Sequence, residues 1–451
     1  MASGAPYVAT VGRGRAPTVA APLPSAVSLN PFRTLVRHRN FRLFWTGQTA
    51  SLVGTWMQVM AEGWLALQLT NNAFLVGLVA SVGAFPVLLL SFPAGVLVDR
   101  VDRLRLVTAM QALLLVQAAA LWALTATGRI TIHWLLALAC FAGTCTAFEV
   151  PARQSLIVDL VGRDDLPEAI ALNSSGFNLA RIVGPAIGAA AIAALGIAAC
   201  FALNALSYLA VLGGLLLIRL PRGAGRSGAA VHEASAWAGL AEGFRYLWRD
   251  PAVRAILGLT LVYSVCGTPA LTLMPVFARD VLGLGAAGYG ALLAAVGVGG
   301  LAGALGLAAL GPRVRPARWL MWSTAAHPAL LVALAFVRHT ALAEAVLLGM
   351  GLAMIVSGAL GNALLQRLVP DRLRGRLMAA WSFLVVGMAQ GVGALGGGAV
   401  ARAYGVDRAI GVGGALMLAY AAWVYARTPE LARVGEERAP DYGAAHEKLA
   451  A

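Results

Sequence analysis

Long apolar stretches recur along this sequence between residues 41 and 426, and they restrict the possible folds more than any other feature. Each is long enough to cross, as an α-helix of about 20 residues, the roughly 30 Å hydrocarbon layer of a membrane. Charged residues make up 12% of the chain, about half their share in a typical soluble domain. We therefore predict an all-α integral membrane protein with twelve transmembrane helices. The expected spans are residues 41–69, 74–98, 104–127, 131–154, 167–190, 198–219, 252–278, 284–311, 317–338, 341–367, 376–402 and 408–426.

The longest polar break inside this region divides the twelve spans into two groups of six. We expect an N-terminal six-helix bundle over residues 41–219 and a C-terminal six-helix bundle over residues 252–426. Residues 220–251 would form a cytoplasmic linker with an amphipathic segment, and residues 1–40 and 427–451 two cytoplasmic tails, the first of them disordered. Similar segments beginning at Leu160 and Leu368 favour two pseudo-symmetric halves, with chance similarity as the alternative.

The formal net charge of +14 is distributed unevenly between the two sides of the expected membrane. Of the 34 basic residues, 28 fall on the side where the chain begins, 5 on the other side and 1 inside a span. This positive-inside pattern predicts a bacterial cytoplasmic (inner) membrane protein with both termini in the cytoplasm. Attraction to anionic lipid explains the charge, so no nucleic-acid partner is expected.

Several residue types that enzymes and pumps require are missing. The only lysine is Lys448, which excludes a Walker A lysine and so an ATP-driven pump in one chain. The sequence has no HExxH or GxSxG pattern, and its four cysteines lack CxxC spacing. We predict that the protein is not an enzyme and holds no metal or cofactor.

The first span carries an acid, Glu62, within the stretch TWMQVMAEGWLAL. Five polar residues of this span recur at steps of three and four positions and so share one helix face: Gln48, Ser51, Thr55, Gln58 and Glu62. Such a face must turn toward a protein interior or a water-filled cavity, and an intramembrane acid on it is a functional candidate. Glu62 could bind and release the coupling proton or cation. It could instead be a fixed ion-pair partner or an acid near the outer headgroups.

Arg181 is the one basic residue within a span, near the bilayer centre. An unpaired charge there is costly, so it should meet a carboxylate, for which Glu149 and Glu62 are candidates, or a polar group of the substrate. Glu149 and Arg153 have the i, i+4 spacing of a helical ion pair, but Pro151 between them is expected to disturb that geometry.

The stretch GVLVDRVDRLR, residues 95–105, places an acid at the C-terminal end of the second span, where the helix dipole favours cations. Five of its residues resemble motif A of the major facilitator superfamily, although Asp102 and Leu104 depart from it: Gly95, Asp99, Arg100, Arg103 and Arg105. The resemblance implies a conformational latch in which Asp99 meets the start of the eleventh span near Arg376. An ordinary charged loop is the alternative.

Small residues recur every four positions in GFNLARIVGPAIGA, residues 176–189. Gly176, Gly184 and Gly188, with Ala180 between them, make a smooth helix face that another backbone can approach closely. With Pro185, the segment resembles motif C, a mark of antiporters in the superfamily. General helix packing without antiport is the alternative.

Residues 43–105, together with PARQSLIVDLV from Pro151, resemble the drug and siderophore exporters of this superfamily, the group containing enterobactin and macrolide efflux proteins. The resemblance implies two six-helix bundles that rock about a central cavity. We predict a secondary active exporter that couples proton entry to release of a small amphipathic or hydrophobic drug, siderophore or metabolite. An importer or facilitator and a non-transporting membrane receptor are the alternatives, and the oligomeric state is open.

Overall fold

The structure, a computed structural model, describes residues 33–162, 164–219, 250–311, 314–369, 381 and 383–432. Within these ranges it is helical and contains no strand. The helices before the linker are α1 (Arg33–Arg37), α2 (Arg39–Thr70), α3 (Ala73–Arg100), α4 (Arg103–Ala126), α5 (Ile132–Val161), α6 (Leu166–Leu195) and α7 (Ile197–Leu216). Those after it are α9 (Pro251–Thr272), α10 (Met274–Val276), η1 (Phe277–Val281), α11 (Ala286–Leu310), α12 (Pro316–Phe336), α13 (Thr340–Leu368), η3 (Phe383–Gly393), α15 (Ala394–Tyr404), α16 (Val406–Arg427) and η4 (Pro429–Ala432).

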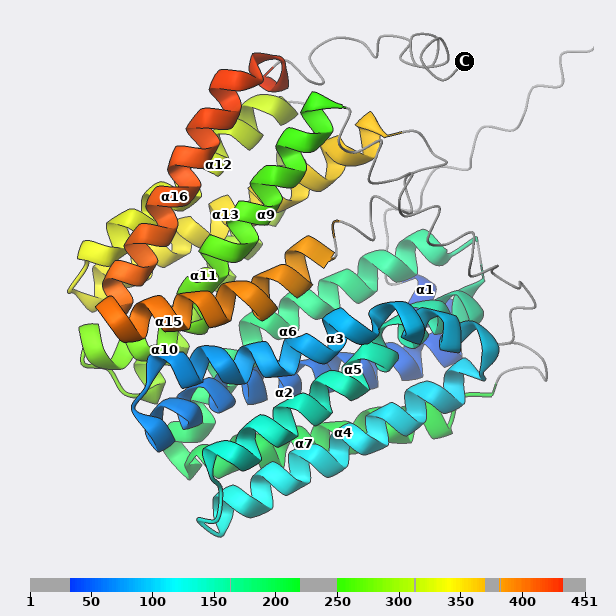
Figure 1. Cartoon of the computed structure of the whole chain (residues 1–451). Helices are drawn as coiled ribbons and strands as arrows, with labels where there is room; N and C mark the ends of the chain where they lie inside the picture. The colour runs from blue at the N-terminus through cyan, green and yellow to red at the C-terminus, as the bar shows by residue number, and fades with distance from the viewer. Residues whose placement is uncertain are drawn as a thin grey trace, which may run out of the picture.

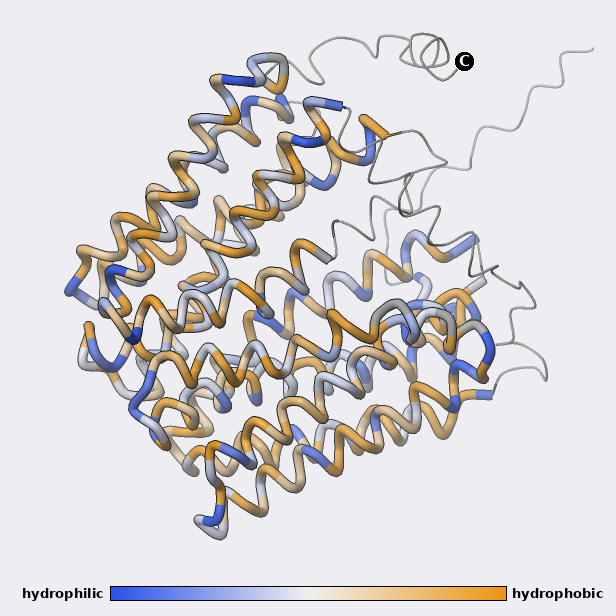
Figure 2. Tube along the Cα trace, in the orientation of Figure 1, coloured by the Kyte–Doolittle hydropathy of each residue, from blue (hydrophilic) through white to orange (hydrophobic). Residues whose placement is uncertain are grey.

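Ten of the described helices are long and apolar enough to cross a membrane. They are α3 to α7, α9, α11 to α13 and α16, and Figure 2 shows the apolar residues distributed along them. The ten do not include α2, which carries the polar face predicted from the sequence, or the stretch formed by η3 and α15. The chain is therefore a multi-pass, all-helical membrane protein.

Two helices extend further than the sequence predicted. α5 continues to Val161 and α6 to Leu195, beyond the expected ends at residues 154 and 190. Each helix stops at a glycine with a positive φ, 76° at Gly162 and 83° at Gly196, a conformation that other residues rarely adopt. The apolar pattern marks the hydrocarbon layer, whereas the glycines mark the helix ends.

Two expected spans are not continuous α-helices. The expected helix 252–278 ends at Thr272, and Pro269 and Pro275 lie on either side of the interruption. In the expected span 376–402, the π-helical segment η3 precedes α15. Proline removes a backbone N–H and accounts for the first break.

The chain start also differs from the predicted disordered tail, because residues 33–40 form α1 and the beginning of α2. Leu35 packs against buried residues of the first helices. Arg37 Nη1 lies 3.0 Å from Asp165 Oδ2, and His38 Nε2 lies 2.6 Å from the same oxygen. These contacts tie α1 to the start of α6, and the bond to His38, followed by the charge of Arg37, lowers the pKa of Asp165. The predicted C-terminal tail begins with the last residue of α16 and η4, and residues 1–32, 220–249 and 433–451 of the predicted tails and linker lie outside the described residues.

The helices form two sets, α2 to α7 and α9 to α16, which we call the first and the second set. Contacts between the sets join α6 to α11 and α3 to η3 and α15. Within the second set, α11 and α13 touch through their backbones: a Cβ added at Gly299 would lie 1.8 Å from the Leu348 carbonyl oxygen, and one at Gly351 would lie 2.0 Å from that of Val296.

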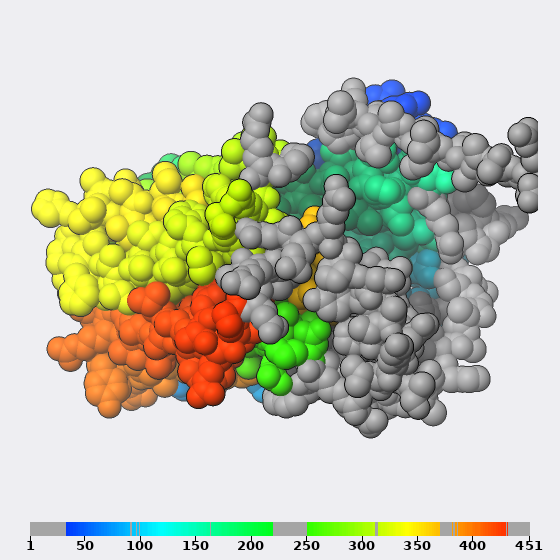
Figure 3. All heavy atoms as spheres, turned by 90° about the horizontal axis from the view of Figure 1, so that it is seen from above, coloured from blue at the N-terminus to red at the C-terminus, as the bar shows by residue number. Residues whose placement is uncertain are grey.

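Successive long helices run in alternating directions between the two ends of the molecule. We call the end where α2 begins and α16 ends the basic end, and the end that contains Asn71 and Gly405 the opposite end. In Figure 1 the two sets converge at the opposite end and diverge toward the basic end. In the view from above in Figure 3, residues of the second set, yellow to red, lie on one side and those of the first set, teal, on the other.

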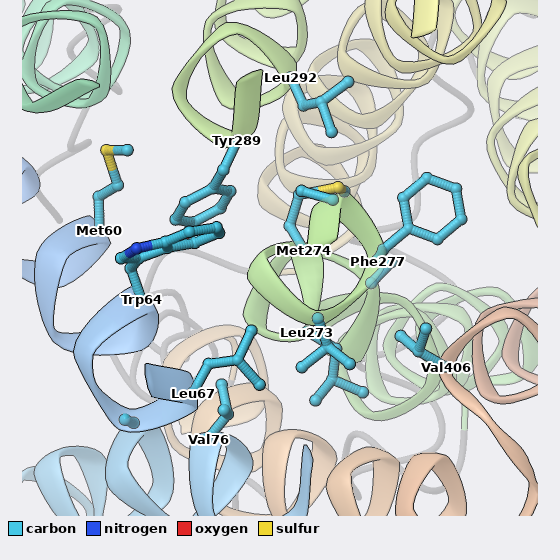
Figure 4. Close-up of a cluster of buried hydrophobic side chains, with 14 of the residues drawn as sticks. Met60, Trp64, Leu67, Val76, Leu273, Met274, Phe277, Tyr289, Leu292 and Val406 are labelled. Carbon is cyan, nitrogen blue, oxygen red and sulfur yellow. The ribbon is translucent and has the colours of Figure 1, made fainter. Parts of the chain in front are cut away.

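Besides the α6–α11 contact, further contacts between the sets involve α2, α3 and Asn71, toward the opposite end. Trp64 of α2 stacks on Tyr289 of α11, with ring centroids 5.8 Å apart, inside the apolar cluster shown in Figure 4. Ser81 Oγ of α3 donates a hydrogen bond to the Gln390 carbonyl oxygen, 3.0 Å away. Arg279 donates a hydrogen bond to the side chain of Asn71.

Glycines set the distance between α6 and α2. A Cβ added at Gly184 would lie 2.7 Å from Trp56 Cβ and 2.8 Å from the Val53 carbonyl oxygen. At Gly188 it would lie 3.0 Å from Met57 Cγ. The structure thus places this face of α6 against the α2 backbone.

We predict that Gly184→Ala lowers the free energy of unfolding by about 1–3 kcal/mol, because the new methyl group overlaps backbone that cannot rotate away. Thermal unfolding of the purified protein in detergent measures the change. The matched control is Gly213→Ala on α7, where an added Cβ meets nothing within 4 Å. There alanine should leave the melting temperature unchanged or raise it. Equal melting temperatures for the two variants would contradict the close approach.

Candidate functional site

The polar face of α2 turns into the first set. Gln48, Ser51 and Gln58 are buried, whereas Thr55 and Glu62 are partly buried. Hydrogen bonds join this face to α4 and α7. Gln111 of α4, which bonds to Gln48, also bonds to Glu149 of α5. The five residues predicted to share a face therefore do so, and that face meets other helices.

Gln58 is the centre of one polar cluster. Its Nε2 donates to Glu62 Oε1 at 2.9 Å and to Gln117 Oε1 of α4 at 3.1 Å. Its Oε1 accepts from Asn204 Nδ2 of α7 at 2.6 Å. Both ends of the amide are thus satisfied, and Glu62 is held beside it. We call these residues the Gln58 cluster: Gln58, Glu62, Gln117 and Asn204.

A second cluster surrounds Glu149 of α5, nearer the basic end. Arg153 Nε donates to Glu149 Oε1 at 2.8 Å, and Gln111 Nε2 of α4 donates to the same oxygen at 3.1 Å. Gln111 Nε2 also lies 3.3 Å from Gln48 Oε1. Contrary to the sequence prediction, Pro151 does not disturb the Glu149–Arg153 pair, because α5 continues through it and keeps the two side chains one turn apart.

Thr55 lies between the two clusters. Its hydroxyl is 2.9 Å from the Ser51 carbonyl oxygen, to which it donates, and 3.4 Å from the Tyr208 hydroxyl of α7. The sequence prediction missed Gln111, Gln117, Asn204 and Tyr208. The criterion that selected the first span, polar residues inside an apolar run, also applies to them.

Arg181 of α6 is separate from both clusters. Neither candidate partner reaches it, because Glu149 binds Arg153 and Gln111 while Glu62 accepts from Gln58. Within the described residues, the Arg181 guanidinium has no hydrogen bond or ion pair. Its Nη2 lies 3.6 Å from the position of a Cβ added at Gly300 of α11, so the side chain reaches the seam between the two sets. The predicted ion pair with Glu149 or Glu62 is therefore wrong in this structure.

The motif A residues lie at the turn between α3 and α4. Asp102, which departs from the family pattern, caps α4 by accepting from Arg105 N at 3.0 Å. Arg103 Nη1 lies 3.0 Å from Asp159 Oδ2 of α5 and so joins α4 to α5. Arg105 is exposed, and a Cβ added at Gly95 would meet nothing within 4 Å.

The proposed latch itself falls outside the described part of the structure. The side chain of Asp99 and all of Arg376 belong to the residues that are not described. Arg100 is described and ends α3.

The three glycines of the motif C segment face α2. Gly176 of α6 faces Trp45 and Thr49 of α2, and Gly184 and Gly188 lie further along the same helix contact. Pro185 lies inside α6 without ending it. In the described ranges, no three His, Cys, Asp or Glu side chains gather where they could hold a metal ion.

We predict that Glu149→Leu destabilises the protein by about 3–5 kcal/mol, because it leaves the buried Arg153 without its carboxylate. The double variant Glu149→Leu/Arg153→Leu removes both charges and should recover part of this loss. Melting temperatures in detergent compare the three proteins. A double variant no more stable than Glu149→Leu would show that the pair is not energetically coupled.

A family described as "Transmembrane secretion effector" matches residues 26–442. The chain is 29% identical over 214 residues to the multidrug efflux pump Tap of Mycolicibacterium fortuitum, covering 46% of this chain and 52% of that protein. It is 28% identical over 168 residues to the staphyloferrin A transporter of Staphylococcus aureus, covering 37% and 42%. It is 24% identical over 247 residues to macrolide efflux protein A of Streptococcus pyogenes, covering 53% and 59%. The chain thus matches about half the length of these relatives.

The fold is similar to solved transporters. A bacterial homolog of the human lysosomal transporter Spinster, in its inward-facing and occupied conformation, superposes with a TM-score of 0.68 at 13% identity, covering 92% of this chain and 100% of that one. A POT family transporter in complex with 5-aminolevulinic acid gives a TM-score of 0.71 at 11% identity, covering 87% and 97%. At these identities the likeness concerns the fold alone.

Proposed function

Because the chain belongs to the transmembrane secretion effector family of major facilitator transporters, we propose that it is a secondary active exporter of a small amphipathic or hydrophobic molecule. The observation that carries the proposal is a polar, partly charged interior in an otherwise apolar helical membrane protein of this family. The relatives named as a multidrug efflux pump, a siderophore transporter and a macrolide efflux protein support export.

The proposal includes twelve spans in two six-helix bundles. Ten spans meet the length and hydropathy requirement. α2, with 32 residues, and the stretch from η3 to α15 supply one more for each set. A polar face lowers the hydropathy of α2 without preventing a span, because that face is covered by α4, α5 and α7.

The positive-inside rule orients this arrangement. The basic end holds most of the arginines that the structure describes and would face the cytoplasm, with both termini, in a bacterial inner membrane. Since contacts between the two sets gather near the opposite end, we infer that this arrangement is the inward-open stage of alternating access.

Glu62 is our proposed site of proton coupling. It lies in a span, is partly buried and accepts a bond from a neutral amide, so protonation would leave no cation unpaired. Asp99 with Arg100, Arg103 and Arg105 remains our proposed latch at the cytoplasmic turn.

Transport into everted membrane vesicles tests the proposed function. We expect vesicles that contain the protein to accumulate an amphipathic fluorescent dye when an inside-acidic proton gradient is imposed, and to lose the accumulated dye when the gradient collapses. Vesicles from cells that lack the protein provide the background. Gradient-driven uptake in right-side-out vesicles, without accumulation in everted ones, would support an importer instead.

We predict that Glu62→Gln abolishes gradient-driven accumulation but preserves substrate binding and energy-independent exchange. Glutamine can still accept the hydrogen bond from Gln58, but it cannot titrate. The matched control is Glu344→Gln, at the start of α13 near the opposite end of the molecule. This variant should accumulate substrate as the wild type does. A Glu62→Gln protein with wild-type accumulation and pH dependence would place coupling elsewhere.

A further inference from the structure

Arg181 is a cation deep in a span without a protein counterion among the described residues. It lies 15 residues from the start of α6, or roughly 22 Å along the helix axis. Glu62 and Glu149, the two acids well inside the spans, bind other groups. A partly buried guanidinium in this position requires an anion or strong acceptors from outside the first set.

The side chain lies on the seam where the two sets meet. Its Nη2 approaches Gly300 of α11. The next residue, Ile182, contacts the position of a Cβ at Gly297, and Pro185 does the same at Gly290. From Arg181 toward the opposite end, this side of α6 is therefore covered by α11.

Toward the basic end, the same helix face becomes polar and exposed. Ser174, Asn178 and Arg181 lie at i, i+4 and i+7, so they share one face. Ser174 and Asn178 are exposed in the structure, although they lie well inside α6. A polar face in continuation with the α11 contact does not suit lipid; it suits the wall of an opening between the sets.

We propose that Arg181 binds an anionic group of the transported molecule at the closed end of this opening, so the cargo is an anionic or zwitterionic amphipath. This rests on the proposed transport function. The guanidinium can donate two parallel hydrogen bonds to a carboxylate, sulfate or phosphate. Ser174 and Asn178 add donors and acceptors along the path from the basic end.

The geometry also gives the anion a role in the transport cycle. A ligand bound to Arg181 lies against α6 of the first set and next to α11 of the second. It would neutralise the arginine at the place where the two sets must move past each other. An uncharged amphipath of the same shape would leave the cation unpaired.

Binding to the purified full-length protein in phosphatidylcholine nanodiscs tests the proposal without any gradient. The probes are 11-(dansylamino)undecanoate, an anionic fluorescent amphipath, and its neutral methyl ester. The wild type should bind the carboxylate more tightly than the ester. Arg181→Gln should weaken carboxylate binding about tenfold or more and leave ester binding unchanged. Arg181→Lys keeps the charge and should lie between the two, and Arg129→Gln, at an exposed turn, should match the wild type.

Two binding outcomes would overturn the assignment. Equal weakening of both probes, or a lower melting temperature for Arg181→Gln, would make Arg181 a structural residue. Unchanged affinity for both probes would place the anion elsewhere or nowhere.

Nanodiscs that contain phosphatidylglycerol separate cargo from lipid. If anionic lipid suppresses carboxylate binding to the wild type but not to Arg181→Gln, the site binds a headgroup phosphate and the cargo assignment fails. Insensitivity to phosphatidylglycerol supports the cargo assignment. Charge-selective binding without any transport in vesicles would support the anion site while removing the exporter function, so the two failures are distinguishable.

Discussion

A polar side chain inside a membrane span must find its hydrogen-bond partners within the protein, and this requirement organises the first set of helices. α2 carries a polar face of five residues, and Gln58 on it binds groups on α4 and α7 as well as its own helix. Rotation of α2 would break several of these bonds together. The glycines of α6 let that helix pack directly on the other side of α2, so the orientation of α2 determines where α6, and with it Arg181, can lie.

The sequence predicted features that depend on one helix at a time. Apolar length located the ten helices that are long and apolar enough to cross a membrane, and the spacing of Gln48, Thr55 and Glu62 identified a face that is indeed turned inward. Bonds between helices were not predictable, because they depend on the rotation and depth of two helices at once. The Arg103–Asp159 pair and the Gln111–Glu149 bond are of this kind. Asp159 and Gln111 lie on spans whose sequence periodicity does not show which side of the helix faces the protein interior.

Of the two partners predicted for Arg181, a carboxylate or a group of the substrate, the carboxylate is not found. Pairing it with Glu149 or Glu62 assumed that opposite charges inside a membrane find one another. The structure places those acids inside the first set and the arginine at its edge, next to the second set. The depth of a residue along a helix can be read from the sequence, but it does not decide which residue pairs with it. The direction in which the side chain points around the helix decides the pairing.

In the second set, α11 and α13 are in direct backbone contact. At Gly299 and Gly351 the two backbones touch, so no side-chain rotamer lies between them to absorb a relative shift. The two helices therefore move together as one rigid unit. Since α11 also forms the seam with α6, a small tilt there becomes, about 30 Å along the pair, a larger displacement of the end of α13 at Leu368.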